Sequence, residues 1–200
     1  MYEAKILVVG CPAAGKTSLI HKAVNNQMTS EYKPTIGVDF AQKQFVINDE
    51  KVMLQLWDIA GQDFYSKLVH VYYKNAIGCI LTCDFSNDHI IQDIKMWYDE
   101  IRSKALLKNG VPVPIYLACN KIDIPKAKQM MEDEGIKMEL QNFQFAHQGF
   151  TSALTGEGVT EMLTFVAEET IKVAKNAGSE KDKLNAVIIQ DDKAKKSGCC

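Results

Sequence analysis

The chain has 200 residues, of which 46% are hydrophobic and 24% charged, and its formal net charge is -2. This near-neutral charge excludes the basic excess typical of nucleic-acid-binding proteins, so we expect no nucleic-acid partner. No apolar stretch approaches the ~20 residues of a membrane-spanning helix, and the N-terminus lacks the basic start of a signal peptide. We expect a monomer with one folded domain over residues 1–175 and a flexible tail over 176–200.

The first third of the chain predicts a strand, a turn, a helix and a hairpin. Residues 6–9 form an uninterrupted apolar run, which is typical of a strand buried on both faces of a parallel sheet. A helix is expected over about 16–25, and the polar segment 27–40 is expected to be irregular. Two strands, at about 38–47 and 51–58, are joined by Asn-Asp-Glu, a sequence that favours a hairpin turn.

After an irregular stretch at 59–70, the remainder of the chain alternates between apolar runs and helical periodicity. Strands are predicted at 77–84, 113–119 and 143–146, and helices at about 90–105, 126–139 and 159–170. Strands that alternate with helices of this length indicate an α/β fold. Since such connections are right-handed, we expect a six-stranded, mostly parallel sheet with helices on both faces.

A phosphate-binding motif follows the first predicted strand. Residues 10–17 read Gly-Cys-Pro-Ala-Ala-Gly-Lys-Thr and fit the pattern G-x-x-x-x-G-K-[ST], between a strand and a helix as this pattern requires. Backbone N–H groups of such a loop wrap phosphates. Lys16 is expected to meet the β- and γ-phosphates, and Thr17 to give its hydroxyl to Mg²⁺. The predicted contacts of this loop are Ala13, Ala14, Gly15, Lys16, Thr17 and Ser18.

A second motif predicts the base of the nucleotide, because the phosphate loop alone is shared by kinases, ATPases and GTPases. Residues 120–123 read Asn-Lys-Ile-Asp and follow a buried strand, where α/β sheets bind ligands. The Asp123 carboxylate can accept hydrogen bonds from N1–H and the exocyclic amine of guanine, and adenine offers no such donor pair. Residues 151–153, Thr-Ser-Ala, resemble a second guanine-binding loop, in which the Ala153 N–H would meet the base oxygen. The predicted base contacts are Asn120, Lys121, Asp123, Ser152, Ala153 and Leu154.

A third motif completes a family resemblance. Residues 57–62 read Trp-Asp-Ile-Ala-Gly-Gln and end the second hairpin strand. With the motifs at 10–17 and 120–123, the chain resembles the Ras superfamily, and within it the Rab family, over about residues 3–175. The resemblance implies the small G-protein form of the P-loop NTPase fold and a GTPase that converts GTP and water to GDP and phosphate.

The resemblance also assigns roles around the γ-phosphate. Asp58 would hold Mg²⁺ through water, and Thr35 would give the metal a second hydroxyl beside that of Thr17. The Gly61 N–H would contact the γ-phosphate, and Gln62 would orient the attacking water. The expected catalytic residues are Gln62, Lys16 and Gly61, and the expected metal ligands are Thr17, Thr35 and Asp58.

Other segments are similar to Rab proteins in particular. They are residues 36–40, 54–57 and 72–76. The Rab aromatic triad, which contacts effectors between the two switch segments, corresponds to Phe40, Trp57 and Tyr72. Ile59, where most Rab proteins carry Thr, and the stretch 109–114 are similar to the Rab subgroup of lysosome-related organelles and phagosomes.

The chain departs from the Rab pattern around the nucleotide. Pro12 removes an N–H donor from the phosphate loop, and Ala13 stands where a positive φ favours glycine. Met28 replaces the aromatic ring that usually covers the guanine. Asp-Phe at 63–64 replaces Glu-Arg, and Leu154 replaces Lys. We expect these changes to alter phosphate affinity and hydrolysis rate without removing the site.

The last two residues, Cys199 and Cys200, resemble the double-cysteine geranylgeranylation signal of Rab proteins. Burial of a prenyl chain contributes about 0.8 kcal/mol per CH₂, so two chains would anchor the protein firmly. Neighbouring lysines would help only weakly on an anionic leaflet, because two aspartates oppose them. With the subgroup resemblance, this predicts the cytoplasmic face of intracellular membranes, endolysosomal or phagosomal, and a soluble cytosolic pool.

The resemblance implies a switch that directs vesicle or organelle traffic. With GTP bound, the γ-phosphate and Mg²⁺ would order residues 30–40 and 59–70, and hydrolysis would release both segments. Because no arginine stands near these elements, we expect slow intrinsic hydrolysis and a GTPase-activating protein that supplies catalytic groups in trans. The other expected partners are an exchange factor, Rab escort protein, GDP dissociation inhibitor and effectors of the GTP form.

Two other functions are compatible with the phosphate loop. A GTPase-like protein that binds nucleotide without switching is favoured by Pro12, Ala13 and Met28. A P-loop kinase acting on a small metabolite is disfavoured by residues 120–123 and by the lack of an arginine-rich lid, since Arg102 is the only arginine in the sequence. Hydrolysis measured with activators tests the first function, and competition between guanine and adenine nucleotides tests the second.

Overall fold

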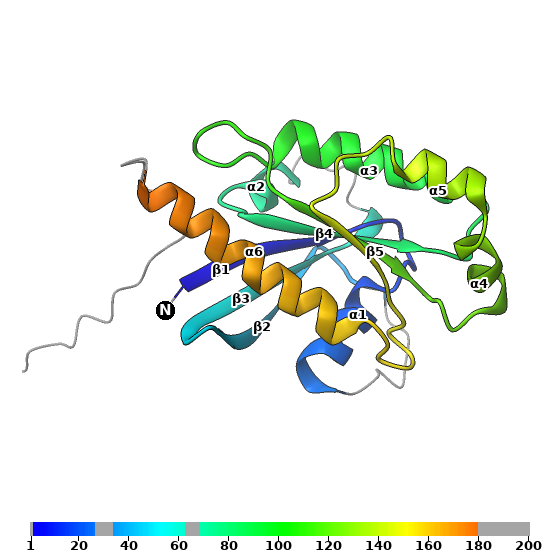
Figure 1. The fold of residues 1–200 in the computed structure, drawn as a ribbon, viewed down its shortest axis with the longest axis horizontal. Coiled ribbons are helices and arrows are strands. Elements are labelled where there is room, and N and C mark those ends of the chain that lie inside the picture. The colour runs from blue at the N-terminus through cyan, green and yellow to red at the C-terminus, as the bar shows by residue number, and fades with distance from the viewer. Residues whose placement is uncertain (1, 27–33, 63–68, 180–200) are drawn as a thin grey trace, which may run out of the picture.

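A six-stranded sheet forms the centre of the computed structural model, which describes residues 2–26, 34–62 and 69–179 (Figure 1). Its strands lie in the order β2-β3-β1-β4-β5-β6, and within this sheet only β2 and β3 pair antiparallel. The strands are β1 (Tyr2–Val9), β2 (Val38–Ile47), β3 (Glu50–Ile59), β4 (Gly78–Asp84), β5 (Ile115–Asn120) and β6 (His147–Phe150). The predicted six-stranded, mostly parallel sheet is confirmed.

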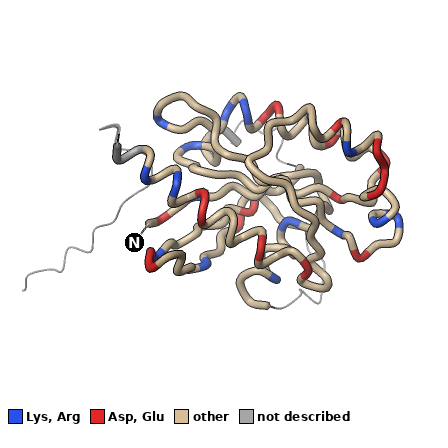
Figure 2. Tube along the Cα trace, in the orientation of Figure 1, with Lys and Arg blue, Asp and Glu red and all other residues tan. Residues whose placement is uncertain are grey.

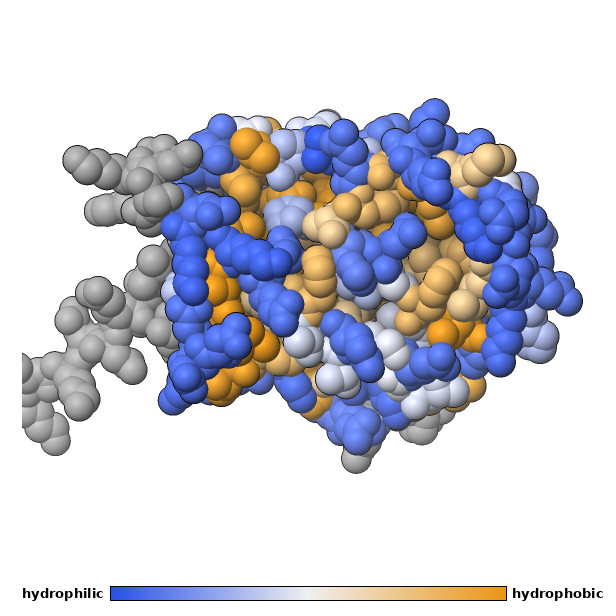
Figure 3. Space-filling model, viewed as in Figure 1, coloured by the Kyte–Doolittle hydropathy of each residue, from blue (hydrophilic) through white to orange (hydrophobic). Residues whose placement is uncertain are grey.

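Helices cover both faces of the sheet, as the α/β pattern predicts (Figure 1). They are α1 (Lys16–Asn25), α2 (Val69–Tyr73), α3 (Ile90–Lys104), α4 (Pro125–Met131), α5 (Glu134–Leu140) and α6 (Val159–Ser179). Figure 2 shows charges of both signs along these helices, whereas the central strands carry few. In Figure 3 hydrophilic residues form most of the visible face, with smaller hydrophobic patches between them. None of the helices within the described ranges is long and apolar enough to cross a membrane.

Two hydrophobic cores lie on opposite faces of the sheet, because successive strand residues point to opposite sides. On β4, Cys79 and Leu81 pack in the core that also contains Trp97 of α3. Ile80 packs in the other core, which contains Leu163 of α6. Burying a side chain of this size contributes roughly 1.5–3 kcal/mol. The continuous apolar runs of the central strands therefore stabilise both layers and hold the strand ends in place.

The segment predicted as one helix over about 126–139 forms two helices. α4 ends at Met131 and α5 begins at Glu134. Asp133 lies between them with an extended backbone, and its carboxylate accepts a hydrogen bond from Ile136 N at 3.0 Å, which caps α5. The apolar residues on both sides of this break indicated a single helix, and the local cap overrides that pattern.

The last strand begins at His147 rather than at the predicted residue 143. Phe143 and Phe145 indicated the strand, but their rings pack on Tyr98 of α3, with centroid separations of 5.1 and 5.4 Å. β6 instead pairs with β5 through a polar sequence at the edge of the sheet, where its side chains remain largely exposed. Tertiary packing of the two phenylalanines therefore decides the position of the strand.

Two helices also differ from the prediction. α2 lies at the end of the stretch that was expected to be irregular. α6 continues to Ser179, past residue 176, where the tail was predicted to begin. Four predictions concern residues outside the described ranges. These residues are Met28, residues 63–64, Cys199 and Cys200.

The carboxyl ends of the parallel strands lie at one edge of the sheet, and the sequence motifs follow them. The phosphate-loop motif follows β1, Gly61 and Gln62 follow β3, and Asn120 is the last residue of β5. This is the edge at which α/β sheets bind ligands. The fold therefore gathers motifs that are far apart in the sequence.

Candidate functional site

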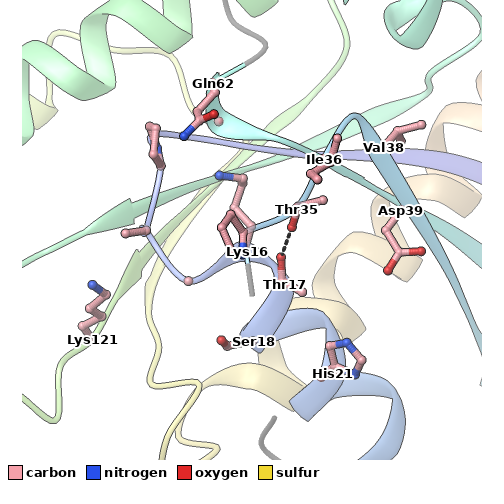
Figure 4. Close-up of a pocket in the computed structure, with 15 residues that line it drawn as sticks. Lys16, Thr17, Ser18, His21, Thr35, Ile36, Val38, Asp39, Gln62 and Lys121 are labelled. Carbon is pink, nitrogen blue, oxygen red and sulfur yellow. Dashed lines mark hydrogen bonds between the residues drawn. The ribbon is translucent and has the colours of Figure 1, made fainter. Parts of the chain in front are cut away.

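A cavity of about 870 Å³ opens at this edge of the sheet (Figure 4). Its walls come from the loop after β1, the first turns of α1, the segment 34–39 before and at the start of β2, and the residues Gly61, Gln62 and Lys121. Lys16, Thr17 and Thr35 point toward the same space in Figure 4. A cavity of this size and polarity fits a small charged ligand.

The loop after β1 has the backbone of an anion-binding turn. Gly15 precedes α1 with φ 95°. Because glycine has no side chain, it does not cap the first N–H groups of that helix. Ala13 has φ 60°, which costs a residue with a Cβ roughly 1–2 kcal/mol. The strain expected from an alanine at this position is therefore present, and the loop keeps its turn in spite of it.

The ammonium group of Lys16 lies against the backbone of this loop. The Lys16 side chain is almost fully buried, and Nζ donates hydrogen bonds to Gly10 O and Cys11 O, each at 2.9 Å. Burial lowers the pKa of Lys16, and the nearby Asp58 carboxylate opposes that shift. An ammonium group has three donors, so these two bonds leave one for a ligand in the cavity.

Two hydroxyls and a carboxylate meet beside Lys16. Thr17 Oγ1 lies 2.8 Å from Thr35 Oγ1 and donates a hydrogen bond to Asp58 Oδ2. Thr35 Oγ1 also approaches Asp58 Oδ2, at 3.4 Å. These three oxygens come from α1, the segment before β2 and the end of β3, as Figure 4 shows for the two threonines.

The Asp58 carboxylate has unused capacity to bind a cation. Asp58 is 2% exposed, and its Oδ1 has no hydrogen-bond partner among the described residues. Burial raises the pKa of Asp58, because a charged carboxylate is poorly solvated there. Hard cations such as Mg²⁺ prefer oxygen ligands. The residues present therefore fit a magnesium ion at this point.

Gly61 and Gln62 lie across the cavity from the hydroxyl cluster. A Cβ on Gly61 would lie 2.4 Å from Pro12 N and 2.7 Å from the carbonyl carbon of Cys11, so the close approach to the phosphate loop requires glycine. Gln62 is exposed at the rim of the cavity (Figure 4). Its amide is thus placed where it can reach water beside a bound ligand.

Asn120 joins the phosphate loop to the base motifs. Its Nδ2 donates to Ala14 O at 2.9 Å, and its Oδ1 accepts from Thr151 Oγ1 at 3.3 Å and Ala153 N at 3.2 Å. Asn120 is 1% exposed, so these bonds are shielded from water. A Cβ on Gly15 would lie 2.4 Å from Asn120 Nδ2, which explains why glycine stands at that contact.

Asp123 is oriented by the neighbouring loop. Its Oδ1 accepts a hydrogen bond from Ser152 Oγ at 2.5 Å, and Ser152 Oγ in turn accepts from Thr155 N at 3.1 Å. The described residues give Asp123 Oδ2 no such bond, so this oxygen is available to a ligand. The Ala153 N–H already donates to Asn120 (3.2 Å), so a base oxygen would have to share it. Leu154 is 58% exposed, and of the predicted base contacts only Lys121 lines the cavity.

Lys121 is held beside the cavity by a partner that the sequence reasoning missed. Its Nζ lies 2.7 Å from Asp84 Oδ2, at the end of β4. Burial alone would raise the pKa of Asp84, but hydrogen bonds from Lys121 and Ser86 outweigh it and lower that pKa. The position of Asp84 after a buried run is the signal that could have identified it. His21, which lines the cavity, was missed as well, and so was the hydrogen bond by which Thr151 of the second loop holds Asn120.

An apolar surface borders the cavity. Phe40 is 48% exposed, and its ring meets Trp57 edge to face with centroids 5.8 Å apart. Tyr72 is half-buried on α2. Ile36, which lines the cavity, is 94% exposed, and Val71 on α2 is 66% exposed. Large exposed apolar side chains beside a ligand cavity are typical of a protein-binding surface.

Comparison with known proteins identifies relatives of this chain. A sequence model of the Ras family matches residues 5–172. The human Ras-related protein Rab-32 is 32% identical over 98% of this chain and 88% of its own length. Rab-32B of Dictyostelium discoideum is 31% identical over 98% of this chain and 76% of its own length. Human Rab-7L1 is 42% identical over 60% of each chain.

Proposed function

The chain belongs to the Ras family of small GTPases and, within it, to the Rab proteins, and we propose that the cavity at the sheet edge binds and hydrolyses its GTP. As a Rab protein it is a GTPase and a GTP-dependent switch in membrane traffic. Its relationship to Rab-32 and Rab-7L1 agrees with the subgroup predicted from Ile59 and residues 109–114.

The phosphates occupy the loop after β1. Its backbone N–H groups and the N-terminus of α1 supply positive partial charge, and the remaining donor of Lys16 reaches the β- and γ-phosphates. Thr17, Thr35 and Asp58 hold Mg²⁺, for which the unpartnered Asp58 Oδ1 is the supporting observation. When bound, Mg²⁺ neutralises the charge that develops on the phosphate oxygens.

Hydrolysis requires water in line with the γ-phosphate. Gln62 at the rim of the cavity orients this water, and the Gly61 N–H contacts the γ-phosphate. Arg102 is the only arginine in the sequence and lies on α3 over the ring of Tyr98, 5.9 Å from its centroid. No arginine therefore reaches the cavity from this chain, and hydrolysis stays slow until an activating protein supplies catalytic groups in trans.

Guanine is selected beside the cavity, next to Lys121. Asp123, fixed by Ser152, accepts hydrogen bonds from the two guanine donors that adenine lacks. The stem of Lys121 covers one side of the site, while Asp84 holds its ammonium group. Asn120 orients the loops through its bonds to Ala14 and Ala153, and the second N–H of its amide remains for the base.

Membrane recruitment completes the proposed switch. Rab proteins associate with intracellular membranes and bind regulators and effectors. We infer geranylgeranylation at Cys199 and Cys200, delivery by Rab escort protein and GDP dissociation inhibitor, and an endolysosomal or phagosomal membrane. Effectors of the GTP form contact Phe40, Trp57 and Tyr72, a choice supported by the exposed apolar side chains around them.

One observation carries this proposal: Lys16 and Thr17 of α1, Thr35 before β2 and Lys121 after β5 line one cavity. Asp58 lies against the two threonines at its side. The bound nucleotide of freshly purified protein, and its single-turnover hydrolysis rate, test it directly. We expect guanine nucleotide, slow unaided hydrolysis and acceleration by an activating protein. ATP that displaces GDP as readily as GTP does would overturn the site assignment.

A non-switching nucleotide-binding protein is the second function to test, because Ala13 holds a strained backbone in the phosphate loop. Strain there can displace the γ-phosphate from Gly61 and Gln62. Hydrolysis that stays absent with an activating protein present would favour this function. Restoring hydrolysis with Ala13→Gly would identify the strain as its cause.

A further inference from the structure

Lys5 of β1 connects β3 with the end of α2. Its Nζ lies 3.7 Å from the ring centroid of Trp57 on β3, and the same Nζ donates a hydrogen bond to Lys74 O at 3.1 Å. Lys74 is the residue directly after α2. One ammonium group therefore contacts both the indole ring and the end of the helix.

Both contacts are of a kind that orients their partners. A cation over an indole face is attracted by the ring quadrupole, and the attraction grows when the cation is partly desolvated. Lys5 is half-buried, and burial lowers its pKa. The last carbonyls of a helix lack partners within it, and a lysine side chain can satisfy them. Asn75, with φ 64°, ends the helical path, so Lys74 O is left to an outside donor.

The backbone of Lys5 strengthens the connection. Lys5 O accepts a hydrogen bond from Ile77 N at 3.0 Å, just after the turn that follows α2. The side chain and the main chain of one residue thus hold both sides of this turn. On the other side of Trp57, the ring of Phe40 on β2 makes its edge-to-face contact. Lys5 is consequently the inner support of the aromatic surface.

We propose that Lys5 is a positioning residue that couples α2 to the ring of Trp57, so that a change of nucleotide at the cavity is transmitted to the effector surface. The inference rests on the proposed function, since α2 follows the segment whose order GTP would control. Lys5 touches neither nucleotide nor metal in this role. It acts by holding the indole ring and the end of α2 at a fixed distance from each other.

Fluorine NMR of the full chain labelled with 5-fluorotryptophan tests the coupling. The sequence contains two tryptophans, and Trp57→Phe assigns the two signals. We expect the Trp57 signal to shift between the GDP form and the form with a non-hydrolysable GTP analogue. In Lys5→Met we expect this shift to fall by about half or more, and Lys5→Arg should retain it because a guanidinium also binds an aromatic face.

Lys43→Met is the matched control. Lys43 lies on β2, and its Nζ also donates to a backbone carbonyl, Val24 O at 3.5 Å, but the structure gives it no contact with a ring. Loss of the Trp57 shift in this control as well, or a full shift in Lys5→Met, would overturn the inference. A Trp57 signal that is the same in both nucleotide forms of the natural sequence would overturn it too.

Nucleotide measurements separate this inference from the function on which it rests. GDP dissociation and hydrolysis in Lys5→Met should stay within about twofold of the natural sequence, because the residue lies outside the cavity. A purified chain that contains no guanine nucleotide and binds none would refute the proposed function itself. Intact nucleotide binding with an unchanged Trp57 shift in Lys5→Met would refute only the coupling.

A second measurement needs no folded Lys5 variant. The indole ring should move the ε-methylene proton signal of Lys5 upfield in the natural sequence, and Trp57→Leu should abolish that displacement. The coupling predicts that the displacement differs between the GDP and GTP-analogue forms. An identical displacement in both forms would contradict it.

Discussion

The proposed base end and the proposed metal end of the nucleotide site are built in opposite ways. At the base end, Asn120 and Asp123 are held by bonds to Ala14, Ser152 and Ala153 that exist without a ligand. At the metal end, Thr17 and Thr35 lie against one oxygen of Asp58 while its other oxygen is buried without a partner among the described residues. The side chains of the proposed base end are thus satisfied within the protein, whereas the proposed metal end keeps one carboxylate oxygen that could bind a cation.

Under the proposed function, this difference would assign selectivity and switching to different parts of the molecule. A preorganised base end would bind guanine in either nucleotide state, because its contacts would not depend on the γ-phosphate. At the metal end, a bound cation would relieve the electrostatic cost of burying the Asp58 carboxylate. Thr35 precedes β2 and Asp58 lies near the end of β3, so loss of that relief changes the segments that border the aromatic surface.

The largest expected effect comes from breaking the base end. Asp123→Asn removes the acceptor for two guanine donors, and we expect a loss of about 3 kcal/mol, or roughly a hundredfold in GTP and GDP affinity. Xanthine nucleotides should instead bind more tightly, because the asparagine amide can donate to the xanthine oxygen that replaces the guanine amine, and the carboxylate repels that oxygen. Competition binding measures both, with Asp99→Asn on the exposed face of α3 as the control. Equal loss for both nucleotides would contradict preorganised guanine selection.

Breaking the metal end should give a smaller loss that depends on the cation. Thr17→Asn is expected to weaken Mg²⁺-dependent GTP binding by about tenfold to a hundredfold. Without Mg²⁺, the variant and the natural sequence should bind GTP with similar affinity. Titration of Mg²⁺ at fixed nucleotide measures the difference, and Thr160→Asn on the surface of α6 is the control. A loss that persists at the same size without Mg²⁺ would show that Thr17 acts on the fold instead.

A substitution at Gln62 should change hydrolysis without changing nucleotide affinity. In Gln62→Leu the water loses its orienting amide, so we expect hydrolysis to slow by roughly tenfold while the affinity for GDP stays unchanged. Single-turnover hydrolysis and GDP dissociation provide the two readouts. Gln92→Leu changes an exposed glutamine of α3 and should alter neither. A parallel loss of GDP affinity in Gln62→Leu would mean that Gln62 supports the cavity wall.

The smallest expected effect comes from removing the ion pair between Asp84 and Lys121 beside the base end. Its pKa is lowered in the folded state, so its ion pair with Lys121 stabilises the fold above the ordinary carboxyl pKa and loses that contribution as the pH falls through the folded-state value. At neutral pH, Asp84→Asn should lower the free energy of unfolding by about 0.5 kcal/mol, since the pair is partly exposed. Urea midpoints compared at neutral and acidic pH measure it. A difference that grows toward acid would have the wrong sign.

The local sequence predicted the structure correctly where no distant contact competed with it. The apolar runs of β4 and β5, the motif between β1 and α1, and the motif after β5 all lie where they were predicted, because strand burial and turn chemistry agree at each point. It was unreliable where a distant contact intervened. Phe143 and Phe145 fit a strand, but Tyr98 of α3 provides a better place for their rings.

The amino-acid sequence by itself determined the α/β class and the family of the protein, and it predicted the nucleotide-binding segments, since these depend on residue types and short spacings. Only the tertiary structure decided that Asn120 ties the phosphate loop to the base loop, that Asp84 holds Lys121, and that Lys5 supports Trp57. Each of these pairs joins residues from different strands or loops. Their distances are set by the register and stacking of the whole sheet, which no local pattern encodes.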